Sequence, residues 1–437
     1  MRRADERGND PRVSDTIFAL SSGTLPAAIA VVRISGPEAF AAAERLAGDL
    51  PPPRTLSLRS LRDEGGELVD KALVAIFPAP ATATGEPLVE LHCHGSRAVV
   101  ARVLEVLAAV PGLRHAEPGE FTRRALQNGR LDLTEAEGLG DLLAAETEWQ
   151  RRAALRAADG GLRRQVEQWR EELVMLAARA EAAIDYVDEE ETELDLSELH
   201  EAAERLRSEW IAALEAPRAE PLQQGLRIVL GGPTNAGKSS LLNALVGCNR
   251  AIVTDIPGTT RDLIEVALDL RGIKVILVDT AGLRESEDRV EQIGVSRSMD
   301  ALRDADLILW LGAPEDAPAH PEIILVHARA DERAGEVVPR EAIATSGRTG
   351  VGLDDLTDAL RRRCEALLPA PEQTSLNRRQ AEALREASDA LNSLKAGDPL
   401  LTAEALRQAM YALDRLSGRQ STEDLLDALF GRFCLGK

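Results

Sequence analysis

The spacing of apolar and polar positions divides the chain into blocks with different periodicities. Residues 15–128 mix strand-like apolar runs with Gly/Pro turns and one helical stretch at 97–110, which predicts a small α+β domain. The strand-like runs cover residues 28–34, 73–77 and 88–92. Residues 130–215 carry a long Ala/Leu/Arg/Glu run with few interruptions besides Gly160 and Gly161, and this pattern predicts helices.

Start and stop signals place helix boundaries within these blocks. The TEAE segment at 134–137 matches a capping box, so we expect a helix to begin there. Residues 377–433 are helical again, with a start signal at 421–424 (STED) and a stop signal near Gly431.

The block between the two helical blocks, residues 222–368, differs from both and is bounded by prolines at 221, 369 and 371. Because the flanking helical blocks resemble each other in composition, insertion of one domain into another is the economical interpretation. The sequence therefore predicts a multidomain α/β protein. Its domains are an N-terminal α+β domain at 1–128, an all-α helical domain at 129–221 plus 369–437, and an inserted Ras-like α/β domain at 222–368.

A nucleotide-binding loop lies in the inserted block. GPTNAGKS at 232–239 follows the apolar run 226–230 and opens a helical pattern that stops at Gly247. Strand, glycine-rich turn and helix are the context that a P-loop requires, whereas a turn without a nucleotide is the alternative. In a P-loop the backbone N–H groups surround the β-phosphate, Lys238 reaches the β and γ oxygens, and the Ser239 hydroxyl binds Mg²⁺.

Two segments downstream support the P-loop interpretation. TTRD at 259–262 offers Thr260 as a second Mg²⁺ ligand and sensor of the γ-phosphate. DTAG at 279–282 follows the apolar run 275–278 and offers Asp279 for water-mediated contact with Mg²⁺ and a glycine amide for the γ-phosphate. Their order and spacing are typical of a P-loop GTPase.

The base specificity is predicted from two weaker signals. ARAD at 328–331 and SGR at 346–348 each follow a strand-like run. Asp331 can accept hydrogen bonds from both guanine N–H donors, and an amide near Gly347 can donate to O6. Adenine presents the wrong edge and would leave buried groups unpaired, so GTP is favoured over ATP.

The first of these signals departs from the usual Asn-Lys-x-Asp pattern. Ala328 replaces the asparagine that braces the surrounding loops, and Arg329 replaces the lysine that stacks on the base. We therefore hypothesise that guanine affinity or selectivity is reduced.

Composition limits the possible partners and the compartment. The 437 residues include 52 basic and 73 acidic side chains, a net charge of −21, which argues against broad affinity for nucleic-acid phosphates. The four cysteines form no C-x-x-C pair, so neither a zinc site nor a disulfide framework is predicted. Residues 1–14 lack an apolar core and no run reaches membrane-spanning length. A cytoplasmic protein without membrane association is expected.

Motifs along nearly the whole chain resemble the tRNA-modification GTPase family called MnmE or TrmE. They are DTI (15–17), VRISG (32–36), FPAP (77–80), GE (85–86), ELHCHG (90–95), PGEFT (118–122), NGRLDL (128–133), NAGKSS (235–240) and FCLGK (433–437). The C-terminal pentapeptide is among the more specific. The SSGTLP segment at 21–26 departs from the family, which more usually has a glycine-rich turn there.

The resemblance implies a folate site and a set of partners. The N-terminal domain would bind a 5,10-methylene- or 5-formyl-tetrahydrofolate through Arg33, Glu90, Arg130 and Lys437, and would form a homodimer. Carboxylate and guanidinium groups suit a pterin edge and glutamate-tail carboxylates. The family acts on tRNA in a heterotetramer with the FAD-dependent MnmG, adding an aminomethyl or carboxymethylaminomethyl group at C5 of the wobble uridine.

The resemblance also implies a potassium ion in place of an arginine finger, held by Asn235, Thr254, Ile256 and Thr259. A cation bridging the phosphates neutralises charge that develops during γ-phosphoryl transfer. Glu291 matches the residue that orients the attacking water, with a solvated helix face as its alternative role. Lys238 and Glu291 are thus the expected catalytic residues.

The full set of expected GTP contacts lies in five segments of the inserted block. They are Asn235, Ala236, Gly237, Lys238, Ser239, Ser240, Thr254, Asp255, Ile256, Pro257, Gly258, Thr259, Thr260, Asp279, Thr280, Ala281, Gly282, Asp331, Ser346, Gly347 and Arg348.

Several alternatives remain open. Cys434 can act as a nucleophile, although no flanking histidine activates it. His92 and His94 alternate on one strand and can bind metal, but no third ligand stands at a recognisable spacing. A ribosome-assembly or signalling GTPase switch is the rival function. It would share the inserted block but has no evident use for the first domain or the C-terminal pentapeptide.

Overall fold

The computed structural model contains two compact units, Met1–Gly140 with Ser417–Lys437 and Asp141–Leu416. The structure describes residues 15–185, 197–252, 264–280, 299–333, 335–370, 373–394, 398–420, 422–431, 433 and 436. Among the helices in these ranges, none is both long and apolar enough to cross a membrane. The division into three domains at 128, 221 and 368 stays a prediction.

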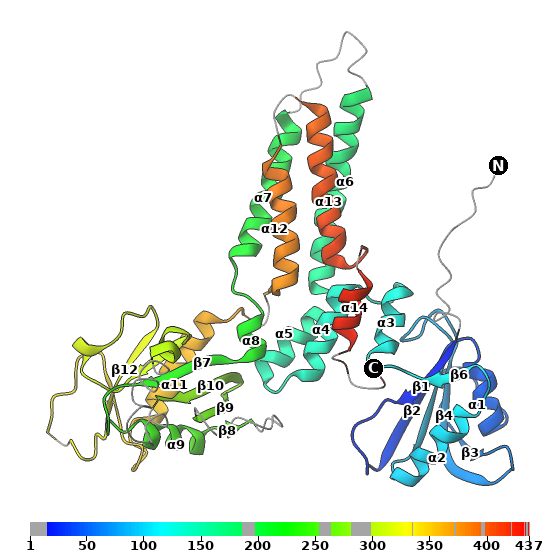
Figure 1. Cartoon of the computed structure of the whole chain (residues 1–437), viewed down its shortest axis with the longest axis horizontal. Coiled ribbons are helices and arrows are strands. Elements are labelled where there is room, and N and C mark those ends of the chain that lie inside the picture. Colours follow the sequence, from blue (N-terminus) through cyan, green and yellow to red (C-terminus); the bar gives the residue numbers. More distant parts are fainter. Residues whose placement is uncertain are drawn as a thin grey trace, which may run out of the picture. The chain divides into compact units, whose positions relative to one another are not determined.

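A mixed β-sheet forms the framework of the first unit (Figure 1). Its strand order over the described residues is β3-β4-β5-β2-β1-β6, and all neighbours are antiparallel except β1 and β6. The strands are β1 (Thr16–Leu20), β2 (Ile29–Ser35), β3 (Ser57–Arg62), β4 (Leu68–Phe77), β5 (Leu88–His94) and β6 (Leu113–His115). The predicted α+β class is confirmed for this part of the chain.

Alternation along the strands divides the side chains of this sheet between two faces. On β5, Val89, Leu91 and Cys93 join the core formed with α1 (Ala39–Ala47) and α2 (Arg97–Ala108). Glu90 and His92 alternate with them and are half-buried. Since successive side chains of a strand point to opposite faces, Glu90 and His92 lie on the face opposite that core.

Helices from the two ends of the chain pack together in the same unit. They are α3 (Glu120–Gln127), α4 (Leu133–Ala144) and α14 (Glu423–Phe430). Leu133 and Ala136 of α4 share a core with Phe430 and Phe433. Arg123 of α3 binds the carboxylates of two α14 residues, Glu423 and Asp427.

The sequence missed some of these elements and misplaced one helix start. Only one helix was predicted between residues 15 and 128. Helices α1 and α3 were missed, since they have nine and eight residues and neither has a side-chain hydrogen bond at its N-cap. The reciprocal cap of α4 joins Asp132 and Glu135, each accepting from the other's backbone N–H at 2.8 Å. The predicted capping box at 134–137 is therefore wrong. With Thr134 as the N-cap, the helix would have begun two residues later than it does. It begins at Leu133, which is fully buried.

The second unit contains a mostly parallel sheet of P-loop type. Its order over the described residues is β13-β12-β11-β7-β10-β9-β8, with β10–β9 and β9–β8 antiparallel. The strands are β7 (Leu226–Gly231), β8 (Arg250–Ala251), β9 (Ile264–Leu270), β10 (Ile273–Asp279), β11 (Leu307–Trp310), β12 (Ile323–Ala328) and β13 (Ile343–Thr345).

Both faces of this sheet are covered, which explains why its central strands are almost continuously apolar. Helices α9 (Lys238–Cys248) and α11 (Leu353–Leu367) share a core with Ile228 and Leu230 of β7. On the other face, Val229 of β7 packs with Ala301 and Ala305.

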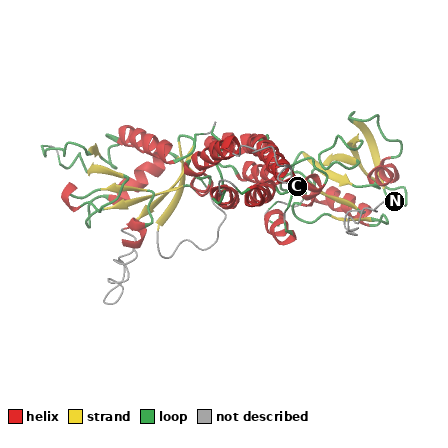
Figure 2. Cartoon of the chain, turned by 90° about the horizontal axis from the view of Figure 1, so that it is seen from above, coloured by secondary structure: helices red, strands yellow, loops and turns green. Residues whose placement is uncertain are grey.

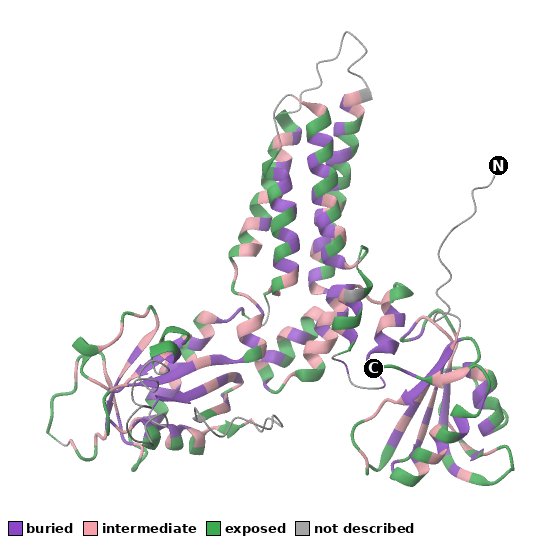
Figure 3. Ribbon diagram, viewed as in Figure 1, coloured by how far each residue is buried: buried purple, intermediate pink, exposed green. Residues whose placement is uncertain are grey.

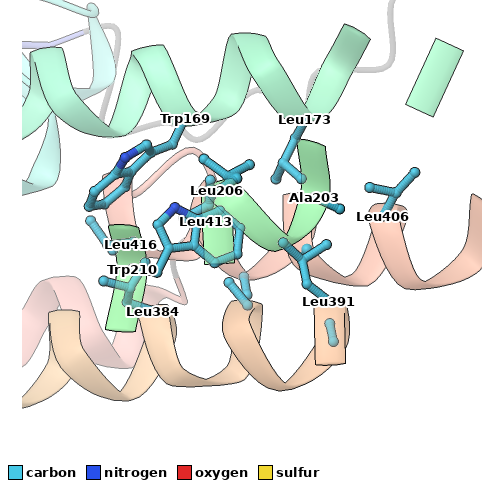
Figure 4. Close-up of a cluster of buried hydrophobic side chains, with 14 of the residues drawn as sticks. Trp169, Leu173, Ala203, Leu206, Trp210, Leu384, Leu391, Leu406, Leu413 and Leu416 are labelled. Carbon is cyan, nitrogen blue, oxygen red and sulfur yellow. The ribbon is translucent and has the colours of Figure 1, made fainter. Parts of the chain in front are cut away.

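A helical bundle in the second unit, seen nearly end-on in Figure 2, is assembled from segments on both sides of the inserted block, residues 222–368. Its helices are α6 (Gly161–Asp185), α7 (Ser197–Glu215), α12 (Arg378–Asn392) and α13 (Pro399–Ser417). Leu173, Leu206, Leu391 and Leu413 come from the four helices and belong to one core (Figure 4). Figure 3 shows buried positions along the inner helix faces.

Two short helices link this bundle to the sheet of the inserted block, α5 (Glu148–Ala158) and α8 (Glu220–Gln224). The Gln150 side chain donates to the carbonyl oxygens of Leu222 and Gln223 at 3.0 and 3.1 Å. Trp149 packs against the core of the inserted block and donates from Nε1 to the Pro369 carbonyl at 3.0 Å. The α5 helix therefore contacts both the point at which the chain enters the inserted block and the point at which it leaves.

Candidate functional site

The predicted phosphate loop lies at the carboxyl end of β7, between the strand and α9. Gly232 (φ 137°), Asn235 (φ 59°) and Gly237 (φ 98°) have positive φ, which explains why two of the three positions are glycine. The loop ends at the N-terminus of α9, where unpaired backbone N–H groups and the helix dipole favour an anion. The local geometry thus suits a phosphate group.

Lys238 is folded back over this loop. Its side chain is buried, and Nζ donates to the carbonyl oxygens of Gly232 and Pro233 at 2.9 and 2.8 Å. The ammonium is consequently held beside the amide-lined turn, where it can exchange a carbonyl partner for a phosphate oxygen.

The expected Mg²⁺-binding elements meet at the same edge of the sheet. Ser239 Oγ donates to Asp279 Oδ2 at 2.6 Å, and Asp279 is the buried last residue of β10. Thr280 Oγ1 donates to the Leu230 carbonyl at 2.8 Å and so joins β10 to β7 beyond the strand ends. A hydroxyl beside a carboxylate is an oxygen donor set that fits Mg²⁺.

The expected base-recognition residues also gather at the carboxyl ends of neighbouring strands. Asp331 follows β12 and Ser346 follows β13. A hydrogen bond from the Ser346 side chain is the main reason why the pKa of Asp331 lies below its ordinary value. Asp331 therefore stays ionised, as acceptance of two guanine N–H donors requires.

The loop after β13 approaches α9 closely. A Cβ on Gly347 would lie 2.7 Å from the Ser240 carbonyl oxygen, so only glycine fits there without movement. The Ser346 hydroxyl accepts from the backbone of Arg348 at 3.3 Å and of Thr349 at 3.1 Å, which holds the turn. The turn is thereby held beside Asp331, the residue expected to bind the base.

Several expected contacts lie outside the described residues. They are Thr254, Asp255, Ile256, Pro257, Gly258, Thr259, Thr260, Ala281, Gly282, Glu291, Cys434 and Lys437. Their roles stay predictions.

In the first unit, the structure brings Arg33 and Glu90 together on the sheet face opposite the α1–α2 core. They are partners in the β2–β5 register, and Arg33 donates to Glu90 at 2.9 Å. His92 Nε2 lies 3.4 Å from the same carboxylate. Burial raises the pKa of Glu90, but the hydrogen bond and charge of Arg33 outweigh it, and the net shift is downward.

Arg130 lies at the edge of this candidate site. Its Nε donates to the Thr82 carbonyl at 3.1 Å, and Asn128 donates to the Thr84 carbonyl at 2.7 Å. Thr84 in turn hydrogen-bonds the hydroxyl of Ser35, two residues after Arg33 on β2, at 2.7 Å. Arg130 and Arg33 are thus linked through the loop between β4 and β5.

The C-terminal segment reaches the same sheet. A Cβ on Gly436 (φ 94°) would lie 2.0 Å from the Leu20 carbonyl oxygen, so Gly436 packs directly on the end of β1. Leu20 pairs with Val32, the neighbour of Arg33. The residue before Lys437 is therefore close to the β2 strand that carries Arg33.

Sequence reasoning missed the residues that position this site. Phe121 of α3 lies under the Arg33 guanidinium, with 5.7 Å from Cζ to the ring centroid. Ser35, Thr84 and Asn128 hold the β4–β5 loop. Their motifs were visible as family resemblance, but the contacts join residues far apart in sequence.

His92 and His94 are engaged by carboxylates. His94 Nδ1 lies 2.7 Å from Asp70, and His92 contacts Glu90. Across the described ranges, no group of three or more His, Cys, Asp or Glu residues is arranged to hold a metal ion. The metal-binding alternative for this histidine pair gains no support.

Nearly the whole chain is similar to known proteins. Residues 16–130 match the family described as GTP-binding protein TrmE N-terminus, and residues 133–434 match the MnmE helical domain. The tRNA modification GTPase MnmE of Erythrobacter litoralis is 49% identical over 425 residues, covering 97% of this chain and 100% of the relative. That of Rhizorhabdus wittichii is 51% identical over 430 residues, covering 97% of each.

The solved G domain of the T. maritima FeoB iron transporter is 25% identical, covers 32% of this chain and 98% of its own, and has a TM-score of 0.24. Residues 16–130 and 133–434 match the two families without overlap, and the relatives align from end to end. The chain belongs to the MnmE family of tRNA modification GTPases.

Proposed function

We propose that this protein hydrolyses GTP to drive modification of tRNA at C5 of the wobble uridine. The one-carbon unit of the added aminomethyl or carboxymethylaminomethyl group would come from a tetrahydrofolate held by the N-terminal sheet. The observation that carries the proposal is the Arg33–Glu90 pair on the sheet face opposite the α1–α2 core, in a chain that also has a phosphate loop. A GTPase that acts only as a switch has no need of the first feature.

In the GTPase block, each described residue has a distinct task. The amides of the loop bind the β-phosphate, and Lys238 shifts from the carbonyl oxygens of Gly232 and Pro233 to phosphate oxygens. Ser239 and Asp279 provide oxygen donors for Mg²⁺, and Asp331 selects guanine. Mg²⁺, when bound, neutralises charge on the β- and γ-phosphates.

Hydrolysis also requires a second cation and an oriented water in this proposal. Asn235 provides an oxygen ligand for K⁺ together with Thr254, Ile256 and Thr259. Glu291 orients the attacking water. K⁺ would supply the charge stabilisation that other GTPases obtain from an arginine finger.

In the first unit, the half-buried Glu90 carboxylate accepts hydrogen bonds from the donor edge of a pterin. Arg33, Arg130 and Lys437 bind folate carboxylates, because guanidinium and ammonium groups match them in charge. Arg33 can orient Glu90 and also bind a folate carboxylate, since it already donates a hydrogen bond to Glu90.

The sheet face that carries Glu90 is also the proposed homodimer surface. Ile29, Leu58 and Leu73 share this face by strand register and are 55%, 62% and 38% exposed. Exposed apolar side chains clustered on one face are typical of an interaction surface. The dimer would join the FAD-dependent MnmG in a heterotetramer that binds tRNA in the cytoplasm.

Mass spectrometry of tRNA nucleosides tests the proposal. A deletion strain should lack the modified wobble uridine, the wild-type gene should restore it, and Glu90→Gln should not. Glu64→Gln, in the exposed β3–β4 turn, is the matched control and should restore it fully. An unchanged nucleoside profile in the deletion strain would favour the rival, a ribosome-assembly or signalling GTPase.

A further inference from the structure

The Thr345 hydroxyl lies in the interior of the GTPase block without a hydrogen-bond partner. Thr345 is the last residue of β13 and is fully buried. Its Oγ1 has no partner among the described residues. Because a buried polar group that loses water without gaining a hydrogen bond is unfavourable, this hydroxyl requires an explanation.

The residue opposite Thr345 explains the missing partner. Ala328, the last residue of β12, pairs with Thr345 in the parallel β12–β13 register. Residues paired in this way place their side chains on the same face of the sheet. The Ala328 methyl group is buried there and neither donates nor accepts a hydrogen bond.

Ala328 also faces the phosphate loop. A Cβ built on Gly237 would lie 3.8 Å from the Ala328 Cβ and 3.4 Å from Cγ of Arg329. Position 328 therefore stands between the base-binding strand end and the loop that binds the phosphates. An asparagine there would carry both a donor and an acceptor, and would have Thr345 on one side and the loop backbone on the other.

We propose that Ala328 sets the residence time of the guanine nucleotide, because its methyl group gives the end of β12 no side-chain hydrogen bond to Thr345 or to the phosphate loop. The Ala330 backbone N–H donates to the Thr345 carbonyl at 3.0 Å, and the β12–β13 ladder pairs Ala328 with Thr345. Both of these hold β12 to β13, and neither reaches Gly237. The proposal rests on the proposed function as a GTPase.

Release of a fluorescent GDP analogue from the full-length protein, followed by stopped flow in Mg²⁺ and K⁺ buffer, tests the idea. Ala328→Asn should slow release about 3- to 10-fold, the effect of one additional net hydrogen bond. Ala366→Asn, on the exposed face of α11, is the matched control and should leave the release rate unchanged.

Thr345→Val provides the decisive second variant. In the wild-type background it should leave release unchanged and should not lower the thermal midpoint, because it removes a hydroxyl that has no partner. In the Ala328→Asn background it should abolish most of the gain, as a double-mutant cycle would report.

Equal release from wild type and Ala328→Asn would overturn the proposal, as would faster release caused by Thr345→Val alone. The measurement on Thr345→Val alone tests the proposal even if Ala328→Asn does not fold. A wild-type protein that binds no guanine nucleotide would instead reject the proposed GTPase function.

Discussion

The hydroxyl of Ser239 donates to the carboxylate of Asp279 over 2.6 Å and thereby connects α9 to the end of β10. The two residues are 40 positions apart in sequence. Two oxygen donors of this kind at one edge of the sheet suit a divalent cation, and they lie beside the turn expected to bind phosphates.

Removal of either donor should therefore impair hydrolysis more than nucleotide binding. Ser239→Ala and Asp279→Asn should each lower kcat by about 10²-fold or more, because charge on the transferred phosphoryl group is stabilised less well. Steady-state GTP hydrolysis across a Mg²⁺ titration measures the effect. Ser208→Ala on the bundle helix α7 is the control, and a normal kcat in Asp279→Asn would contradict the assignment.

Hydrolysis should depend on the monovalent cation. Replacing K⁺ with Na⁺ should lower the rate on the order of 10³-fold, comparable to loss of an arginine finger. Asn235→Ala should reduce the K⁺-stimulated rate and leave the slow Na⁺ rate almost unchanged. Equal wild-type rates in the two salts would show that Asn235 has another role.

The Arg33–Glu90 pair predicts a defined pH dependence of stability. The pKa of Glu90 is lowered in the folded protein, so the ionised carboxylate stabilises the fold above the unfolded glutamate pKa of about 4.3. This contribution is lost as the pH falls through the lower, folded pKa. The wild type should therefore have a higher thermal midpoint than Glu90→Gln near neutral pH, and the difference should shrink below about pH 4. A difference that grows in acid would have the wrong sign.

Docking of the C-terminal segment should require glycine at position 436. Gly436→Ala combines a left-handed backbone conformation with a Cβ 2.0 Å from the Leu20 carbonyl oxygen. We expect the segment to be displaced, with folate binding weakened about tenfold or more, since misplacing Lys437 costs at least one charge-assisted hydrogen bond. Isothermal titration with 5-formyl-tetrahydrofolate measures this, and GTP hydrolysis should persist. Gly66→Ala in the open β3–β4 turn, also at positive φ, controls for backbone strain alone.

The contact between α5 and the GTPase block should contribute to stability. The Gln150 amide is buried, accepts from the backbone of Glu146 and Thr147, and donates to Leu222 and Gln223. Gln150→Ala leaves these groups without their partner and should lower the free energy of unfolding by about 1–3 kcal/mol. Denaturant unfolding measures the loss, and Gln408→Ala on the exposed side of α13 should cost far less.

Elements whose signals are local were predicted well from the sequence. The phosphate loop follows from eight consecutive residues, and the limits of α14 follow from the start signal at 421–424 and the stop signal at Gly431. The helix α1 and the edge strand β3 were missed, because α1 has only nine residues and no side-chain cap, and only one residue of β3 is buried.

The sequence by itself determined the order of the blocks, the phosphate loop, and the residue types available for Mg²⁺ and guanine, because each depends on neighbours along the chain. Only the tertiary structure decided which residues meet. Strand pairing places Ala328 opposite Thr345 and Arg33 opposite Glu90, and packing of the chain end places Gly436 on Leu20. Such contacts depend on strand register and packing over long sequence separations, which local periodicity does not encode.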